Sequence, residues 1–215
     1  MKLRSLALAA LAATSISAQA GLTSYAPWDA AYTANGLGGV QFNVQTNGGA
    51  TVALGAHAYR NGATLANNGT DTFYAQSGVY GAGPDPSYAN WSFDFAWNLG
   101  TNCSGCTVHL LVDKDPTAAA FFVDLFTLNA GFAPLITASQ IQESWNMEMV
   151  FMTGLVYDFN PYAPSSTGFA LQVLDGNNAL VVGSDITVNV PEPESLALVG
   201  LALAGLAITR RRRKV

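Results

Sequence analysis

The 215 residues, half of them hydrophobic, suffice for one domain once targeting segments are set aside. Charged residues make up 11% of the chain, well under the ~25% of an average soluble domain. Between Gly21 and Val190 only Arg60 and Lys114 are basic, against twelve acidic residues, which gives a net charge of 2 − 12 = −10. This balance excludes attraction to nucleic acid or anionic lipid by bulk electrostatics, and no nucleic-acid partner is expected.

Residues 1–20 have the three parts of a signal peptide. Residues 1–4 carry two basic side chains, Lys2 and Arg4, and residues 6–13 form an apolar run that is too short to span a membrane. Ala18 and Ala20 supply the A-x-A pattern of a cleavage site. The sequence therefore predicts export, with Gly21 as the first residue of the mature chain.

Short strands are predicted through most of the following segment. Residues 40–60 predict a hairpin, because apolar and polar residues alternate on both sides of Asn47-Gly48-Gly49. Ser139–Trp145 is expected to form a short helix, with Ser139 as its N-cap. The expected further strands are 70–80, 90–99, 106–112, 120–128 and 147–157, followed by a closing hairpin between Phe169 and Val190 that turns at 175–178.

The segment 90–99 has the clearest strand pattern. Trp91, Phe93, Phe95 and Trp97 fall on one face, and polar or small residues fall on the other. A period of two over ten residues indicates that the aromatic face packs into a core. About seven to nine short strands at regular spacing predict an all-β fold: a single antiparallel β-sandwich, Ig-like or jelly-roll-like, over residues 21–189.

Cys103 and Cys106 are the two cysteines of the chain. A CxxC pair is used for redox chemistry, as half of a metal site, or as a small disulfide. Redox use needs the first cysteine at a helix N-terminus, but a strand-like segment follows here. A zinc site would recruit His109 and still lack a fourth ligand. Export to an oxidising compartment favours the disulfide.

Other candidate chemical groups are scattered and match no catalytic or metal-binding motif. His57 is interpreted as a structural histidine. Glu143 and Glu148 are possible paired carboxylates of a glycosidase. Three aspartates are candidate Ca²⁺ ligands: Asp113, Asp115 and Asp124. Five aromatic residues in expected loops are candidates for stacking on sugars: Trp28, Tyr32, Tyr80, Tyr88 and Tyr162. We expect neither a metal nor a cofactor.

The last 26 residues, 190–215, differ in composition from the rest. Pro191-Glu192-Pro193 breaks regular structure, because proline lacks an N–H donor and restricts the residue before it. Residues 195–209 form an uncharged, mostly apolar run that predicts a short transmembrane helix of about 22 Å. Five basic residues follow and are expected to stay cytoplasmic: Arg210, Arg211, Arg212, Arg213 and Lys214.

This order of features resembles the PEP-CTERM sorting signal of Gram-negative bacteria. The resemblance is limited to the tail, together with the signal peptide. It implies that an exosortase, an integral-membrane protease, reads Pro191, Glu192 and Pro193 at the inner membrane. It also implies a transient membrane anchor with the domain outside, followed by delivery to the cell surface or extracellular matrix.

The sequence therefore predicts a non-catalytic surface or matrix protein, associated with extracellular polysaccharide or biofilm. One alternative is a carbohydrate-binding module, which requires a concave face with two or three exposed aromatic rings. Another is a secreted hydrolase, which requires clustered carboxylates or a nucleophile–histidine pair in a pocket.

Overall fold

The computed structural model describes residues 22–24, 39–60, 62–115, 121–152 and 159–192. The predicted signal peptide with its cleavage site, Pro193, the predicted helix 195–209 and the basic residues 210–214 lie outside the described residues.

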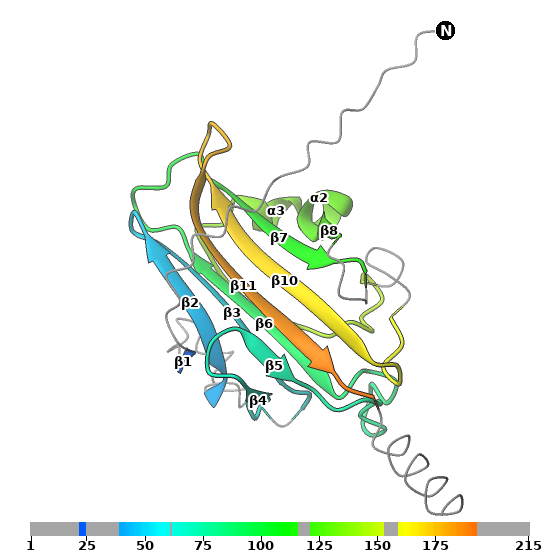
Figure 1. The fold of residues 1–215 in the computed structure, drawn as a ribbon. Helices are drawn as coiled ribbons and strands as arrows, with labels where there is room; N and C mark the ends of the chain where they lie inside the picture. The colour runs from blue at the N-terminus through cyan, green and yellow to red at the C-terminus, as the bar shows by residue number, and fades with distance from the viewer. Residues whose placement is uncertain (1–21, 25–38, 61, 116–120, 153–158, 193–215) are drawn as a thin grey trace, which may run out of the picture.

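The described strands form two sheets (Figure 1). Sheet A has the order β1-β2-β3-β6-β9, and sheet B has the order β4-β5-β11-β10-β7-β8. Sheet A consists of β1 (Thr23–Ser24), β2 (Gln41–Asn47), β3 (Ala50–Ala58), β6 (Trp91–Asn98) and β9 (Gln140–Trp145). Sheet B consists of β4 (Ala66–Asn67), β5 (Thr72–Tyr74), β11 (Leu180–Val190), β10 (Ser165–Leu174), β7 (Thr107–Asp113) and β8 (Phe122–Asp124). The short helices α2 (Leu125–Leu128), η2 (Ala130–Phe132) and α3 (Ala133–Ile136) follow β8.

The two sheets pack face to face, as in a β-sandwich, and one hydrophobic core lies between them. The ring centroids of Phe93 in sheet A and Phe169 in sheet B are 4.3 Å apart. The prediction of an all-β fold is confirmed.

The strands are mostly antiparallel, but β5 pairs with β11 in parallel, so the predicted purely antiparallel arrangement is wrong at this pair. Since β5 and β11 are far apart in the chain, no tight turn forces them to run in opposite directions.

Strand β6 is an interior strand of sheet A, between β3 and β9, and both of its faces are buried. Trp91, Phe93, Phe95 and Trp97 are at most 1% exposed, so the predicted inward-facing aromatic row is confirmed. The Trp97 indole Nε1 donates a 2.9 Å hydrogen bond to the Ala138 carbonyl, which satisfies the polar atom of that ring.

The predicted hairpin 40–60 is confirmed as β2 and β3. Its turn contains Gly48 and Gly49, both with positive φ (60° and 85°), a backbone conformation that glycine adopts without steric cost. The polar face of β2 lies toward sheet B, where the Asn43 side-chain amide donates to the Asp185 carbonyl at 2.8 Å. Ser184 Oγ donates back to the Asn43 carbonyl, also at 2.8 Å. These reciprocal bonds fix the edge of sheet A against β11.

The predicted helix at Ser139–Trp145 is wrong, because residues 140–145 form strand β9. Six consecutive residues pair with β6, and Trp145 packs edge-on against Phe95 at 4.7 Å between ring centroids. Burial of that ring and a ladder of backbone hydrogen bonds outweigh a capping signal.

Three other expected strands differ from the structure. Of 70–80, only Thr72–Tyr74 form a strand, β5, apart from an isolated bridge at Val79. In the described part of 120–128, which begins at residue 121, only residues 122–124 form a strand. The Asp124 carboxylate then accepts from Phe126 N at 3.1 Å and caps α2. The expected strand at 147–157 is replaced in its described part by turns, including Met149 N to the Asn146 carbonyl at 3.1 Å. The closing hairpin is confirmed as β10 and β11.

We predict that Phe95→Ala lowers the free energy of unfolding by about 3–5 kcal/mol, because it leaves a cavity in a row of fully buried rings. The matched control Phe121→Ala removes a ring that is 54% exposed, and should cost less than about 1 kcal/mol. Denaturant unfolding of both variants measures the difference. Equal losses would show that the β6 aromatic row does not carry the core.

Candidate functional site

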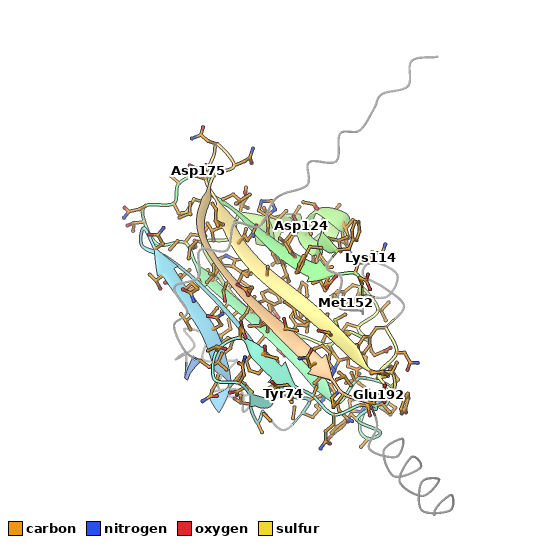
Figure 2. All side chains as sticks on the ribbon, in the orientation of Figure 1. Tyr74, Lys114, Asp124, Met152, Asp175 and Glu192 are labelled. Carbon is orange, nitrogen blue, oxygen red and sulfur yellow. A yellow bond between two sulfur atoms is a disulfide. The ribbon has the colours of Figure 1, made fainter. Side chains whose placement is uncertain are left out.

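Strand β11 places the start of the tail at one end of the two sheets. Val190, its last residue, is 3% exposed and pairs with Ser165 at the start of β10. The neighbouring backbone is held as well, because Ala75 N donates to the Asn189 carbonyl at 2.9 Å. Pro191 and Glu192 follow directly, exposed and outside any strand. Figure 2 shows Glu192 and Tyr74 at this end and Asp175 at the other. We call these the tail-proximal end and the distal end.

An open hollow of about 480 Å³ lies at the tail-proximal end. Its lining combines aromatic, aliphatic and polar side chains from three loops: Val79, Ser87, Glu148, Phe159, Asn160, Pro161 and Tyr162. The loops are joined by backbone hydrogen bonds, from Gly78 N to the Pro161 carbonyl at 2.6 Å and from Asn90 N to the Gly78 carbonyl at 3.1 Å. The Tyr162 side chain is 61% exposed, so its ring is accessible to a ligand.

A second aromatic group at this end surrounds Tyr59. Its ring contacts Tyr80 edge-on at 5.4 Å and Tyr88 at 5.6 Å between centroids. Arg60 forms an ion pair with Asp85, and its guanidinium lies over the Tyr59 ring, 5.3 Å from the centroid. Burial raises the pKa of Tyr59, so its hydroxyl stays protonated and donates to Asp85. The ion pair neutralises one of the two basic residues of the domain.

Exposed apolar side chains gather around the tail exit. Tyr74 (45% exposed) pairs in register with Asn189, and Tyr80 (39%) packs on Tyr59. Val150, 87% exposed, lies in the turns that follow β9. Together with Tyr162 these residues make up the exit rim: Tyr74, Tyr80, Val150 and Tyr162.

The distal end is built from polar turns. Asn47 Nδ2 donates to the Val181 carbonyl at 2.7 Å and joins the β2–β3 turn to β11. The Asp175 carboxylate accepts from Ala179 N and Asn177 N, at 2.9 and 2.8 Å. These backbone hydrogen bonds lower the pKa of Asp175, so its carboxylate stays charged at neutral pH.

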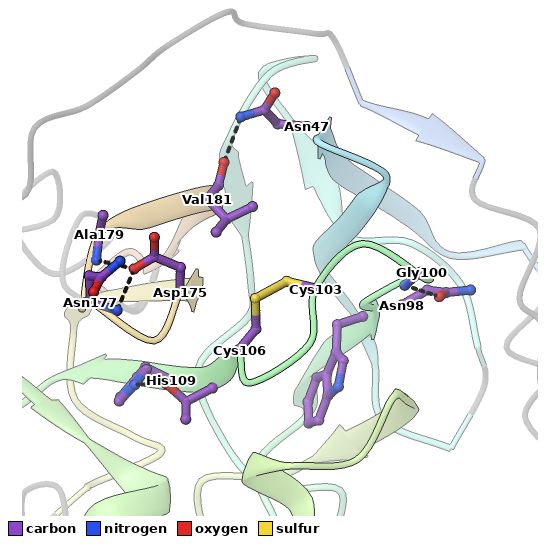
Figure 3. The surroundings of a disulfide bond; sticks show 12 residues. Asn47, Asn98, Gly100, Cys103, Cys106, His109, Asp175, Asn177, Ala179 and Val181 are labelled. Carbon is purple, nitrogen blue, oxygen red and sulfur yellow. Dashed lines mark hydrogen bonds between the residues drawn. A yellow bond between two sulfur atoms is a disulfide. The ribbon is translucent and has the colours of Figure 1, made fainter.

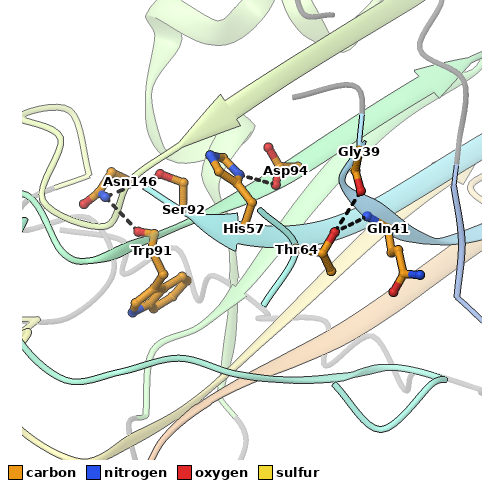
Figure 4. A network of polar contacts seen from close by, with 8 residues as sticks. All are labelled: Gly39, Gln41, His57, Thr64, Trp91, Ser92, Asp94 and Asn146. Carbon is orange, nitrogen blue, oxygen red and sulfur yellow. Dashed lines mark hydrogen bonds and ion pairs between the residues drawn. The ribbon is translucent and has the colours of Figure 1, made fainter. Parts of the chain in front are cut away.

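His57 is buried beside Asp94 on the side of sheet A that faces away from sheet B (Figure 4). Its Nδ1 lies 2.7 Å from the Asp94 carboxylate, and both side chains are at most 3% exposed. Asn146 lies nearby and donates to the Trp91 carbonyl at 2.7 Å. This environment supports the interpretation of His57 as a structural histidine, because a buried carboxylate requires a partner.

His109 belongs to a second polar chain, on the outer face of sheet B. Thr107 Oγ1 lies 3.0 Å from its Nε2, and the Asp124 carboxylate lies 2.7 Å from its Nδ1. A hydroxyl, an imidazole and a carboxylate in this order match the connectivity of a hydrolase triad. None of the three lines the hollow at the tail-proximal end.

The acidic candidates do not converge. The Asp113 carboxylate accepts hydrogen bonds from Asp115 N and Phe121 N, at 3.0 and 2.8 Å, and so stabilises the segment that follows β7. Asp124 pairs with His109 instead of joining them. Glu148 lines the hollow, whereas Glu143 lies on the edge strand β9. Within the described residues there is no group of three or more acidic, histidine or cysteine side chains that could hold a metal ion.

Cys103 and Cys106 lie at disulfide distance, with Sγ atoms 2.08 Å apart, in the distal loop between β6 and β7 (Figure 3). Cys106 N donates to the Cys103 carbonyl at 3.1 Å, so the two residues close a tight turn. Gly105 takes a φ of 78° within it. Cys106 is 8% exposed and belongs to the core cluster, which anchors the loop to the sheets.

The described ranges contain no helix that is both long enough and apolar enough to cross a membrane.

The two sheets form an all-β domain whose last strand, β11, runs directly into Pro191 and Glu192. Residues 189–213 match the PEP-CTERM protein-sorting motif, and the recognition of the tail is confirmed. This motif implies exosortase-dependent sorting of an exported protein. Comparisons with curated proteins and with solved structures each found no match, and the finer Ig-like or jelly-roll-like assignment stays a prediction.

We predict that Cys103 and Cys106 are oxidised to each other in protein recovered from the periplasm or the medium, as mass spectrometry without reduction would show. In the double variant Cys103→Ser with Cys106→Ser, the free energy of unfolding should fall by about 2 kcal/mol, which is the entropic stabilisation expected from closing so short a loop. Free thiols or bound zinc in the exported protein would contradict the assignment.

Proposed function

We propose that this protein is a non-catalytic component of the cell surface or extracellular matrix of a Gram-negative bacterium. In this proposal the precursor is anchored in the inner membrane by residues 195–209, with the domain outside. An exosortase then reads Pro191, Glu192 and Pro193 and removes the helix and basic tail. The observation that carries the proposal is that strand β11 ends at Val190, within the first two residues of the sorting motif at 189–213.

The local chemistry supports this division of roles. Pro191 cannot donate a backbone hydrogen bond, so the ladder between β10 and β11 stops at Val190 and leaves Glu192 exposed. A protease binds extended backbone, which a proline-flanked segment supplies. The cluster Arg210–Lys214 would hold the tail's end in the cytoplasm and fix the topology.

Association with extracellular polysaccharide is the finer part of the proposal, and a specific carbohydrate-binding module is its sharper alternative. The hollow supports both, because Phe159 and Tyr162 supply ring surfaces beside the polar groups of Ser87, Glu148 and Asn160. The net charge of −10 between Gly21 and Val190 favours neutral sugar contacts over electrostatic ones. A secreted hydrolase ranks third, since the Thr107–His109–Asp124 chain lies away from the hollow.

We predict that Glu192→Ala with Pro193→Ala blocks removal of the tail in cells with an active exosortase. The unprocessed chain should accumulate in the inner membrane, whereas the wild type should reach the surface or the medium without residues 195–214. Fractionation with an antiserum against the domain and intact mass of the products measure this. Thermal unfolding of the domain should be unchanged, because Glu192 lies outside the strands.

The matched control is Glu194→Ala, which removes the neighbouring carboxylate but leaves Pro-Glu-Pro intact, and it should be processed normally. A wild-type chain that stays full-length in the inner membrane, despite an active exosortase, would identify the tail as an ordinary anchor.

We predict that Tyr162→Ala weakens retardation of the processed protein in a gel containing the producing cell's own polysaccharide. In this proposal the Tyr162 ring is an anchor of the sugar contact, and loss of such an anchor costs at least about 1 kcal/mol, or about fivefold in affinity. Tyr74→Ala removes an exposed tyrosine outside the hollow and should bind as the wild type does. Equal retardation of all three proteins would remove the hollow as a sugar site.

A further inference from the structure

We propose that the exit rim (Tyr74, Tyr80, Val150 and Tyr162) rests on the phospholipid surface of the inner membrane while the precursor is anchored. This inference rests on the proposed function, because it requires residues 195–209 to lie in the bilayer. In this proposal the partner of the exit rim is the interface between headgroups and acyl chains. The rim residues lie outside the sorting motif.

The length of the connection sets how far the domain can be from the membrane. Val190 ends β11, and five residue steps separate it from Ser195, where the predicted helix begins. A fully extended chain covers at most about 18 Å in five steps. Each headgroup region is itself about 5–8 Å deep, so little room remains between the tail-proximal end and the lipid.

The distribution of side chains decides which surface meets the lipid. Tyr162 is 61% exposed and lines the hollow. Val150 is 87% exposed and lies two residues beyond Glu148, which lines the same hollow. Tyrosine favours the interface, where its ring lies among acyl chains and its hydroxyl reaches water and headgroups. The distal end carries instead the charged Asp175 and the polar turn residues Asn47 and Asn177.

Charge limits how strong this contact can be. The domain is acidic, and Arg60, one of its two basic residues, is engaged by Asp85. Repulsion from anionic lipid therefore opposes the few apolar contacts. The tail overcomes this by holding the rim at a high effective concentration near the bilayer. Removing the tail also removes that effect, so processing would release the domain without any change in its fold.

The experiment uses the full-length chain with the native disulfide intact and one added cysteine carrying an environment-sensitive fluorophore. The three positions are Val150→Cys in the rim, Asn177→Cys in the distal turn as the matched exposed control, and Ala204→Cys in the predicted helix. Each variant is reconstituted into vesicles of phosphatidylethanolamine and phosphatidylglycerol. Quenching by spin-labelled lipid reports the depth of each label, and thermal unfolding checks that the domain is intact.

We expect strong quenching at 204, quenching at 150 at least about twofold above that at 177, and little quenching at 177. Cleaving the labelled chain after the domain should abolish quenching at 150. Quenching at 204 with equal, low values at 150 and 177 would overturn the rim contact and leave the anchored precursor standing. No quenching at any position would overturn both proposals. Shielding of position 150 that occurs in native inner membranes but not in vesicles would assign the rim to a membrane protein and overturn the lipid contact.

Discussion

The stacking of β6 against β10 is the interaction on which the rest of the structure depends. Phe93 and Phe169 meet at 4.3 Å across the two sheets, and Phe95 packs against Trp145 at 4.7 Å within sheet A. Rings of this size each remove a large apolar area from water, so a row of them dominates the stability of a domain of this length. The row also fixes which face of each neighbouring strand points inward. Strand β9 takes its place beside β6 for this reason.

The position of the tail follows from the same packing. Strand β11 pairs with β10 along its whole length and with β5 on its other side, and its last residue is as well buried as the core. The described domain therefore ends as a paired strand at the residue before Pro191. A motif that has to be read at a membrane is thereby kept close to one defined end of the domain. The hollow and the exit rim lie at that end, so in the proposed precursor both would face the lipid, and release would open the hollow to the surroundings.

Burial separates the roles of the two histidines, although each lies 2.7 Å from a carboxylate. The His57–Asp94 pair is almost fully enclosed, where removing one partner would leave an uncompensated polar group at a cost of several kcal/mol. The His109–Asp124 pair is partly exposed, with side-chain exposures of 24% and 13%, and water screens it. The same residue types thus hold the fold together in one sheet and form a polar surface chain on the other.

The sequence by itself determined the elements whose signals are local. Period-two alternation predicted β2, β3, β6 and the closing hairpin, and the order Pro-Glu-Pro, apolar run and basic cluster predicted the sorting tail. Tertiary structure decided what local signals leave open. Pairing with β6 made a strand of 140–145, where an N-cap signal predicted a helix. Distance in the chain left β5 free to pair in parallel with β11. The sequence singled out Tyr80 and Tyr162 as loop aromatics, but it could not predict the hollow or the exit rim, because loops far apart in the chain meet there only after the two sheets have packed.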